Sequence, residues 1–259
     1  MSVTALPIQD SSCTKSDRIV VITGAGRGIG AACAHAFAAN GVGQVVLLAR
    51  TESELETVAG QVEALGSSAR IHSVDVTKVD DIERVFQCIE RIDVLVNCAG
   101  LNVPQPFLEV NPITFDRIWE VNVRATYFVA QAAAQRMVTN GKHGVIVNIT
   151  SQMGHVGAAL RSAYCTSKHA VEGMTKALAV ELAPHGIRVV SIAPTFVRTS
   201  MTEQQLDDPN IGTKLLADIP IGRFGNPTEI AAAVVFAASK DAGLFTGSSL
   251  LLDGGWTAK

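Results

Sequence analysis

Long apolar runs, clustered basic residues and paired cysteines are all missing from this sequence. No apolar run reaches the ~20 residues that cross a bilayer, so we expect no membrane span. No lysine or arginine run forms a basic stripe, and the formal net charge is −3. We therefore expect neither a nucleic-acid partner nor a membrane surface as partner. Charged residues make up 17% of the chain, against an average of about 25%, which suits a large core.

The cysteines and histidines show no pattern of a structural site. The five cysteines include no C-x-x-C pair and no disulfide-like spacing, so we expect reduced thiols in a cytoplasmic protein. His143 and His169 have no neighbours at metal-ligand spacing, and no metal is assigned. Residues 1–17 mix Ser, Thr, Asp and Lys without an apolar core, which predicts a flexible lead-in and not a signal peptide. Residues 18–259 contain no linker or repeat and are expected to form a single domain.

Short apolar runs alternate with helical patterns along the whole of this domain. Helical periodicity spans residues 31–40, 52–65, 79–89, 113–139, 163–184 and about 225–239. The β-branched or apolar runs expected as strands are 19–23, 44–49, 69–74, 92–96, 144–149, 187–193 and 249–252. This alternation predicts an α/β fold, a Rossmann-type doubly wound, mostly parallel seven-stranded sheet with helices on both faces.

A glycine-rich turn, Gly24-Ala25-Gly26-Arg27-Gly28-Ile29-Gly30, joins the first expected strand to the first expected helix. Glycines let the backbone approach a phosphate, and a helix N-terminus offers free N–H groups and a positive dipole end. The G-x-x-x-G-x-G spacing is wider than the best-known dinucleotide fingerprint. The strand before it and the helix after it favour nucleotide binding over a turn without a ligand.

The end of the second expected strand indicates which nucleotide is bound. An acidic residue here would hold the adenosine ribose hydroxyls, but the sequence has Ala49 followed by Arg50. A guanidinium at Arg50, with Arg27 beside it, fits a 2′-phosphate. This favours NADP(H) over NAD(H), unless both arginines are simply solvated. Asp75 is either a partner of the adenine amino group or a helix cap ahead of Asp80.

Tyr164 and Lys168 are four residues apart, so they share one face of a helix. An adjacent ammonium group lowers a phenol's pKa from about 10, and such a pair can move a proton on or off an alcohol oxygen. The pair also fits a half-buried helix residue and a solvated lysine. Ser151 ends a strand thirteen residues earlier. Asn122 lies in an apolar helical pattern, where it needs a backbone partner or anchors a water.

A long connection at residues 195–219 follows the sixth expected strand and has no strong periodicity. Segments of this kind beyond a strand end are often lids or binding loops. We therefore expect this segment to cover a substrate.

Together these motifs resemble the short-chain dehydrogenase/reductase family in its compact one-domain branch. The resemblance covers about residues 18–256 and departs from the family at Cys98, where Asn is frequent, and at Thr195, where Gly is frequent. Neither departure touches a catalytic group. The residues that carry it are Thr23 to Gly30, Asn97-Cys98-Ala99-Gly100, Asn122, Ser151, Tyr164, Lys168, Pro194 and Asp253-Gly254-Gly255.

The resemblance implies an NAD(P)-dependent oxidoreductase that interconverts a ketone and a secondary alcohol by hydride transfer. Tyr164 would be the proton donor or acceptor, and Lys168 would lower its pKa and bind the nicotinamide ribose. Ser151 would donate a hydrogen bond to the carbonyl oxygen. Asn122 would hold a water that links Lys168 to solvent.

Further positions follow from the same resemblance. Cofactor contacts are expected at Gly24, Arg27, Gly28, Ile29, Gly30, Arg50, Asp75, Val76, Asn97, Ala99, Gly100, Tyr164, Lys168, Pro194, Val197 and Thr199. The substrate side is expected at Asn102, Val103, Gln152, Met153, His155, Thr195 and Met201. The resemblance also implies a homotetramer built on helices 113–139 and 163–184 and on the C-terminal strand region.

The substrate is left open by the sequence. A 3-oxoacyl-thioester reductase would need a basic patch for a carrier protein, and only Arg124, Arg161 and Lys176 are scattered candidates. A sugar or polyol dehydrogenase is equally compatible. A non-catalytic nucleotide-binding sensor on the same scaffold would be expected to lack part of the catalytic set, which is complete here.

Overall fold

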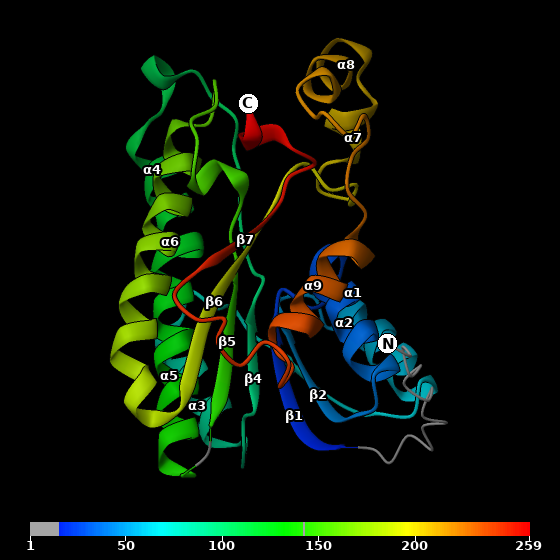
Figure 1. The fold of residues 1–259 in the computed structure, drawn as a ribbon, viewed down its shortest axis with the longest axis vertical. Coiled ribbons are helices and arrows are strands. Elements are labelled where there is room, and N and C mark those ends of the chain that lie inside the picture. Colours follow the sequence, from blue (N-terminus) through cyan, green and yellow to red (C-terminus); the bar gives the residue numbers. More distant parts are fainter. Residues whose placement is uncertain (1–15, 142) are drawn as a thin grey trace, which may run out of the picture.

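The computed structural model describes residues 16–141 and 143–259, which form a seven-stranded sheet (Figure 1). All strand pairs are parallel, in the order β3-β2-β1-β4-β5-β6-β7. The strands are β1 (Ser16–Thr23), β2 (Val42–Ala49), β3 (Ser68–Ser73), β4 (Val94–Asn97), β5 (Gly144–Ile149), β6 (Ile187–Pro194) and β7 (Ser249–Leu252). The predicted doubly wound parallel fold is confirmed. β1 begins at Ser16, so the last two residues assigned to the lead-in belong to the sheet, and residues 1–15 lie outside the described part.

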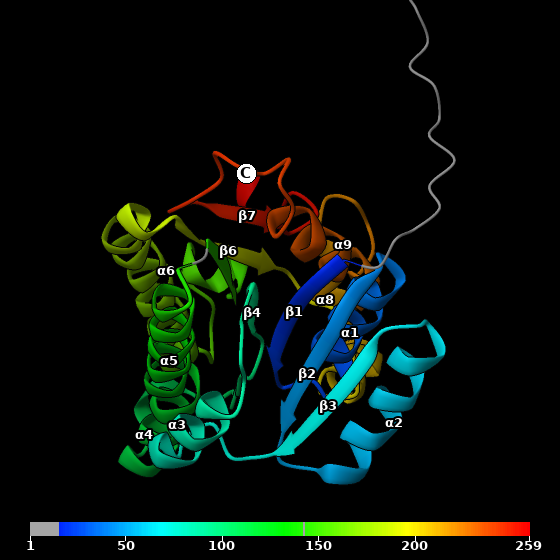
Figure 2. The same ribbon diagram turned by 90° about the horizontal axis from the view of Figure 1, so that it is seen from below.

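Helices cover both faces of the sheet, because its strands are apolar on both sides. The helices α1 (Gly28–Ala39), α2 (Glu52–Ala64) and α9 (Pro227–Ala237) cover one face (Figure 2). The other face carries α3 (Val79–Gln87), α4 (Pro112–Trp119), α5 (Thr126–Thr139) and α6 (Ser162–Leu182). Phe37 and Phe86, both 2% exposed, lie in the core on opposite faces.

The chain order reverses between β1 and β4, which are neighbours in the sheet although two strands separate them in sequence. The chain therefore leaves the carboxyl ends of these two strands in opposite directions. A crevice opens at such a point, and ligands of open α/β sheets bind there. The fold thus directs the glycine turn after β1 and the Asn97–Gly100 segment after β4 toward one site.

The helical region predicted for residues 113–139 is not one regular α-helix. A π-helical segment, Glu120–Ala125, separates α4 from α5, and Asn122 lies within it. A π-turn is a wider turn that is often found at functional sites. The Asn122 side chain bonds to other parts of the chain, as described below, and the wider turn accommodates it in an otherwise apolar helix.

The segment 195–219 contains two helices that the sequence pattern did not predict, α7 (Glu203–Asp207) and α8 (Pro209–Ala217). Asp208 caps α8 by accepting a hydrogen bond from the Asn210 N–H, and Pro209 occupies the first turn, both common helix-start features. Leu206 is 5% exposed and packs with Met153 and Phe196. The segment therefore contains regular helices and is not an irregular loop.

Short helical turns complete the described chain: the 3-10 segments Phe107–Glu109, Gln152–Gly154, Ala183–His185 and Trp256–Ala258. Among the described residues, no helix is both long and apolar enough to cross a bilayer, and no three His, Cys, Asp or Glu side chains cluster as metal ligands. The four described cysteines are free thiols.

Candidate active site

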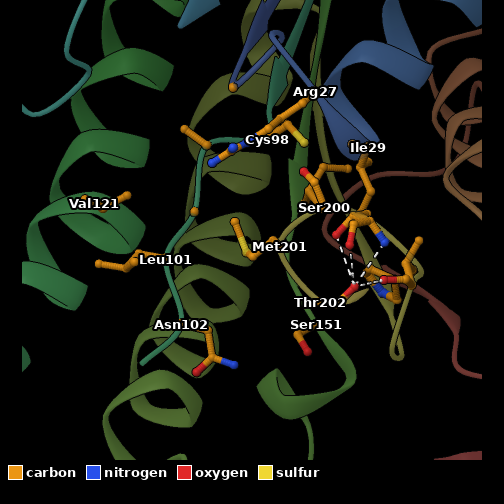
Figure 3. Close-up of a pocket in the computed structure, with 18 of the residues that line it drawn as sticks. Arg27, Ile29, Cys98, Leu101, Asn102, Val121, Ser151, Ser200, Met201 and Thr202 are labelled. Carbon is orange, nitrogen blue, oxygen red and sulfur yellow. Dashed lines mark hydrogen bonds between the residues drawn. The ribbon is translucent and has the colours of Figure 1, made fainter. Parts of the chain in front are cut away.

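One pocket runs along the carboxyl ends of β1, β2, β4, β5 and β6. In Figure 3, Arg27 and Cys98 lie toward one end of the view, and Asn102 and Ser151 lie toward the other. Gly24 and Arg50 line the first end, and Tyr164 and Lys168 line the second. The pocket thus brings the glycine turn and the Tyr/Lys pair, which are far apart in sequence, into a single site.

The glycine turn has a shape that only glycines allow. Gly24 and Gly28 have positive φ angles of 65° and 58°, which L side chains rarely adopt. A Cβ on Gly24 would lie 2.9 Å from the backbone nitrogen of Ala99, and a Cβ on Gly30 would lie 2.2 Å from the Gly24 carbonyl oxygen. No side chain caps the N-terminus of α1. Its first-turn N–H groups therefore remain available to an anion, which fits the pyrophosphate of a dinucleotide.

A carboxylate that the sequence pattern did not indicate lies at the same end of the pocket. Glu54, on α2, lines the pocket with Ala49 and Arg50. Its Oε1 lies 3.6 Å from Nη1 of Arg27, and both side chains are partly exposed. This end of the pocket therefore carries a negative charge from Glu54, although β2 does not end in an acidic residue.

Asp75 lies at this end of the pocket too. Burial raises the pKa of its carboxyl, but hydrogen bonds from Thr77 and the charges of Arg50 and Lys78 leave the pKa below its ordinary value. The N-cap of α3 is Lys78 and not Asp75. Asp75 is thus an ionised pocket residue and not the cap of α3.

Tyr164 lies in the first turn of α6 and lines the other end of the pocket. Burial raises the pKa of its phenol to about 12, while a hydrogen bond with Ser151 and the charge of Arg161 partly offset that effect. Ser151 is 8% exposed, and its Oγ also accepts a hydrogen bond from the Met153 N–H at 3.2 Å. The hydroxyl groups of Ser151 and Tyr164 therefore adjoin at one point of the pocket.

Lys168 lies behind Tyr164 and is 5% exposed. Its Nζ donates to the Ile149 carbonyl at 3.0 Å and lies 5.6 Å from the Tyr164 ring centroid. Burial lowers the pKa of Lys168 to about 8, and the charges of Cys98 and Glu172 partly offset this. The positive charge that partly offsets the effect of burial on the phenol is that of Arg161. The lowering of the Tyr164 pKa by Lys168 stays a prediction.

Asn122 does not line the pocket but supports it. Its Oδ1 accepts from the Leu101 N–H at 2.7 Å, and its Nδ2 donates to the Leu101 carbonyl at 2.8 Å and to Ser167 Oγ at 2.9 Å. A Cβ on Gly100 would lie 3.6 Å from Asn122 Oδ1 and 3.8 Å from Lys168 Nζ. Asn122 and Lys168 thus approach the same point on the chain after β4 without bonding to each other.

Most of the other expected residues line the pocket. On the cofactor side these are Gly24, Arg27, Gly28, Ile29, Arg50, Asp75, Val76, Ala99, Gly100, Pro194, Val197 and Thr199. On the substrate side they are Asn102, Gln152, Met153, Thr195 and Met201.

Besides Asn122, four expected residues lie outside the lining: Gly30, Asn97, Val103 and His155. Asn97 is buried, and its Nδ2 donates to Asn148 Oδ1 at 3.0 Å. His155 Nε2 lies 3.1 Å from Ser249 Oγ and 3.2 Å from Glu172 Oε1. Both polar side chains have partners within the protein. Gly30 lets α1 pack closely on the glycine turn, because a Cβ at this position would clash with the Gly24 carbonyl.

The structure adds residues that the sequence pattern did not single out for the site. Thr202, on the segment after β6, donates to the Val197 carbonyl at 2.6 Å and accepts from the Thr199 N–H at 3.0 Å (Figure 3). Phe196 lines the pocket, and Arg161 lies over its ring at 5.6 Å. The i, i+3 relation of Arg161 to Tyr164 was the available sequence signal, because such residues are neighbours on a helix.

The comparisons with known proteins agree with this geometry. The family model described as "Enoyl-(Acyl carrier protein) reductase" matches residues 24–257. The human protein L-xylulose reductase is 37% identical over 241 residues, which are 93% of this chain and 97% of that protein. A short-chain type dehydrogenase/reductase from Mycobacterium marinum superposes with a TM-score of 0.89 at 37% identity, covering 94% of this chain and 97% of the other. A gluconate 5-dehydrogenase from Burkholderia cenocepacia, in complex with NADP and tartrate, gives 0.89 at 30% identity, covering 95% and 97%.

Proposed function

Because the chain belongs to the short-chain dehydrogenase/reductase family, we propose that it uses NADP(H) to interconvert a polyhydroxylated ketone and its secondary alcohol. Membership of the family makes it an NAD(P)-dependent oxidoreductase of CH–OH and C=O groups. The preference for NADP(H) and the substrate class are the new elements. The observation that supports this reaction is that Ser151, Tyr164 and Lys168 line one pocket whose other end is the glycine turn.

The nicotinamide, when bound, supplies or accepts the hydride at the substrate carbon. In the direction of reduction, the Ser151 hydroxyl donates a hydrogen bond to the carbonyl oxygen as negative charge develops there. The Tyr164 phenol then delivers its proton to the same oxygen, giving the alcohol. Both residues line the same pocket, so a single oxygen atom of the substrate would contact both hydroxyl groups.

Lys168 and Asn122 have supporting roles in this proposal. The buried ammonium of Lys168 would hold the nicotinamide ribose and restore the proton lost by Tyr164. Asn122 fixes the chain after β4 beside that ammonium. A water relay from Lys168 to solvent through Asn122 is part of the same proposal.

The NADP(H) preference rests on Arg50 and Arg27, which line the ribose end of the pocket. A guanidinium binds a phosphate through two parallel hydrogen bonds. Glu54 opposes this preference, because its carboxylate would repel a 2′-phosphate. We propose that Arg27 leaves Glu54 for the phosphate and that the two arginines outweigh the single acid.

The substrate class rests on the polar character of the other end of the pocket and on the relatives. Asn102 Oδ1, Thr195 Oγ1 and the side-chain amide of Gln152 are buried there without hydrogen-bond partners. Such groups suit a substrate with several hydroxyls, and L-xylulose reductase and a gluconate 5-dehydrogenase act on such molecules by name. The oxoacyl-thioester alternative is disfavoured because Arg161 is buried and Arg124 binds the Thr77 carbonyl, so these arginines form no open basic patch.

Three further features belong to the proposal. The segment 195–219 covers the substrate side, since Thr195 to Gln205 contribute to the pocket lining. The protein assembles as a homotetramer through α4, α5, α6 and the C-terminal strand region. It acts in the cytoplasm, in keeping with the free thiols of the four described cysteines.

The test is Tyr164→Phe, assayed with a panel of ketoses, polyols and sugar acids against NADPH, NADH and their oxidised forms. Loss of the phenol proton should lower kcat by roughly 10²–10⁴-fold, while the Kd for NADPH stays nearly unchanged. Tyr127→Phe, a tyrosine outside the main pocket, is the matched control and should retain activity. Substantial turnover by Tyr164→Phe would show that Tyr164 does not transfer the proton.

A further inference from the structure

Two buried polar side chains near Ser151 and Tyr164, those of Arg161 and Gln152, have nitrogen or oxygen atoms without hydrogen-bond partners in the described structure. Arg161 is 6% exposed, and its Nε and Nη2 lack partners. Gln152 is 1% exposed, and both its Oε1 and its Nε2 lack partners. Native proteins rarely leave buried polar groups unpaired, and a charged group least of all. The unpaired atoms of both side chains therefore indicate a ligand that supplies the missing hydrogen-bond partners and the counter-charge.

Gln152 lines the substrate end of the pocket, and Arg161 lies next to Phe196, a residue of that lining. Gln152 directly follows Ser151 and lines the pocket. The Arg161 guanidinium lies 5.6 Å from the ring centroid of Phe196, a lining residue, and its charge is felt by the Tyr164 phenol. Gln152 thus forms part of the pocket wall beside Ser151, and Arg161 lies next to that wall at Phe196, near the phenol that would bind the reacting oxygen.

The charge of Arg161 has no counter-ion among the residues that the structure describes. Across residues 16–141 and 143–259, no carboxylate forms an ion pair with it. Glu172, a buried carboxylate of the same helix, is already bonded by the hydroxyls of Thr150, Ser191 and Ser249. An anion at Arg161 must therefore come from outside the described chain.

The backbone holds Arg161 in place at some cost. Leu160 has a φ of +63°, the one positive φ of a non-glycine residue in the described chain, a conformation that is unfavourable for leucine. Its carbonyl accepts a hydrogen bond from the Gln105 N–H at 2.8 Å. Arg161 then forms the N-cap position of α6 without capping it by its side chain. The guanidinium therefore does not cap the helix, and its Cζ lies 5.6 Å from the Phe196 ring centroid.

We infer that Arg161 and Gln152 bind a carboxylate of the substrate, so that the preferred substrates are polyhydroxylated acids and not neutral polyols or ketoses. This inference rests on the proposed function and narrows its substrate class. A guanidinium binds a carboxylate through two parallel charge-assisted bonds. The Gln152 amide can donate to the same carboxylate and accept from a neighbouring hydroxyl. A neutral polyol would pair Gln152 but leave the buried charge uncompensated.

The experiment compares acids with neutral molecules of equal carbon number, threonate with threitol and gluconate with glucitol, as substrates for oxidation. The wild-type protein should favour the acid in kcat/KM. Arg161→Met, which keeps much of the side-chain volume without the charge, should lower the acid-to-polyol ratio by on the order of 10–100-fold. Arg161→Lys should recover part of that ratio. Arg124→Met, a substitution of an exposed arginine outside the pocket lining, is the matched control and should leave the ratio unchanged.

Calorimetric binding of the same acids separates this inference from the proposed reaction. If the acids bind in a manner that depends on Arg161 but none is oxidised, the proposed reaction is wrong and the carboxylate site stands. If Arg161→Met binds or turns over acids and polyols in the wild-type ratio, the carboxylate site is wrong. A wild-type preference for the neutral member of both pairs would also overturn it.

Discussion

Asn122 and Leu101 exchange two hydrogen bonds, with the Asn122 amide accepting from the Leu101 N–H at 2.7 Å and donating to its carbonyl at 2.8 Å. The same amide donates to Ser167 on α6. One side chain thus ties the chain after β4 to the π-helical segment and to the helix that carries Tyr164 and Lys168. This connection makes Asn122 a positioning residue for the site.

Asn122→Asp should disrupt that connection while changing the side chain very little. The carboxylate can still accept from the Leu101 N–H but cannot donate to the Leu101 carbonyl or to Ser167. We expect unfolding to become easier by about 1–3 kcal/mol and kcat to fall by up to roughly 100-fold, because the site loses its alignment. Denaturant unfolding and kcat measured on the same preparation test this. Asn210→Asp, at an exposed position, is the control, and equal behaviour of the two variants would contradict the positioning role.

The pKa of Tyr164 can be measured directly, because the chain has only two tyrosines. In Tyr127→Phe, the tyrosinate absorbance reports Tyr164 alone. Burial raises the pKa of Tyr164 to about 12, so we expect little tyrosinate at pH values where an ordinary phenol, with a pKa of about 10, is half ionised. Reduction uses the protonated phenol and oxidation uses the phenolate. Oxidation should therefore gain with rising pH, while reduction is already favoured at neutral pH.

Ser151→Ala in the Tyr127→Phe background tests the cause of this pKa. The hydrogen bond with Ser151 lowers the pKa of Tyr164, so its removal should move the titration to still higher pH. Ser248→Ala, at an exposed serine, should not move it. A Tyr164 phenol half ionised at or below about pH 10 would show that burial does not control its proton.

Arg50→Ala and Glu54→Gln should shift cofactor preference in opposite directions. Removing the Arg50 guanidinium weakens NADP+ binding, and removing the Glu54 charge strengthens it, because the 2′-phosphate carries the negative charge. Each change should alter the ratio of the Kd values for NADP+ and NAD+ by roughly tenfold, on the order of 1.4 kcal/mol. Arg70→Ala, an arginine outside the pocket that bonds to the Cys88 carbonyl, is the control. A wild-type preference for NAD+, with Arg50→Ala neutral, would refute the assignment of NADP(H).

The sequence was sufficient for the sheet and for the line of motifs along its edge. Strands such as Gly144–Ile149 and Ser249–Leu252 were predicted with their observed bounds, because their apolar runs end at clear turn residues. Parallel strands then bring their carboxyl ends to one edge, so Gly24, Ser151 and Pro194 meet at the pocket. Local pattern and topology alone account for these predictions.

The sequence was insufficient where a residue's role depends on partners distant in the chain. The sequence predicts His155 on the substrate side, and in the structure it lies outside the pocket lining, beside Glu172 and Ser249. Arg161 was considered only as a surface charge, yet it is buried beside Phe196. Glu54 enters the pocket because α2 packs at the end of β2. The periodicity of a sequence predicts which side of a helix or strand is apolar. It does not predict which side chains of other elements contact that helix or strand.

The outer helices leave large apolar side chains in contact with solvent. Ile113 is 81% exposed, and Trp119 and Tyr127 are 39% and 45% exposed, all on α4 and α5. Apolar patches of this kind mark protein–protein contacts more often than free surface. We therefore expect a tetramer of the 27.2 kDa chain by light scattering at micromolar concentration. Tyr127→Glu should dissociate it by placing a charge in the interface, whereas Leu65→Glu, at a 50% exposed leucine that follows α2, should not. A wild-type mass equal to one chain would exclude the tetramer and leave the apolar face unexplained.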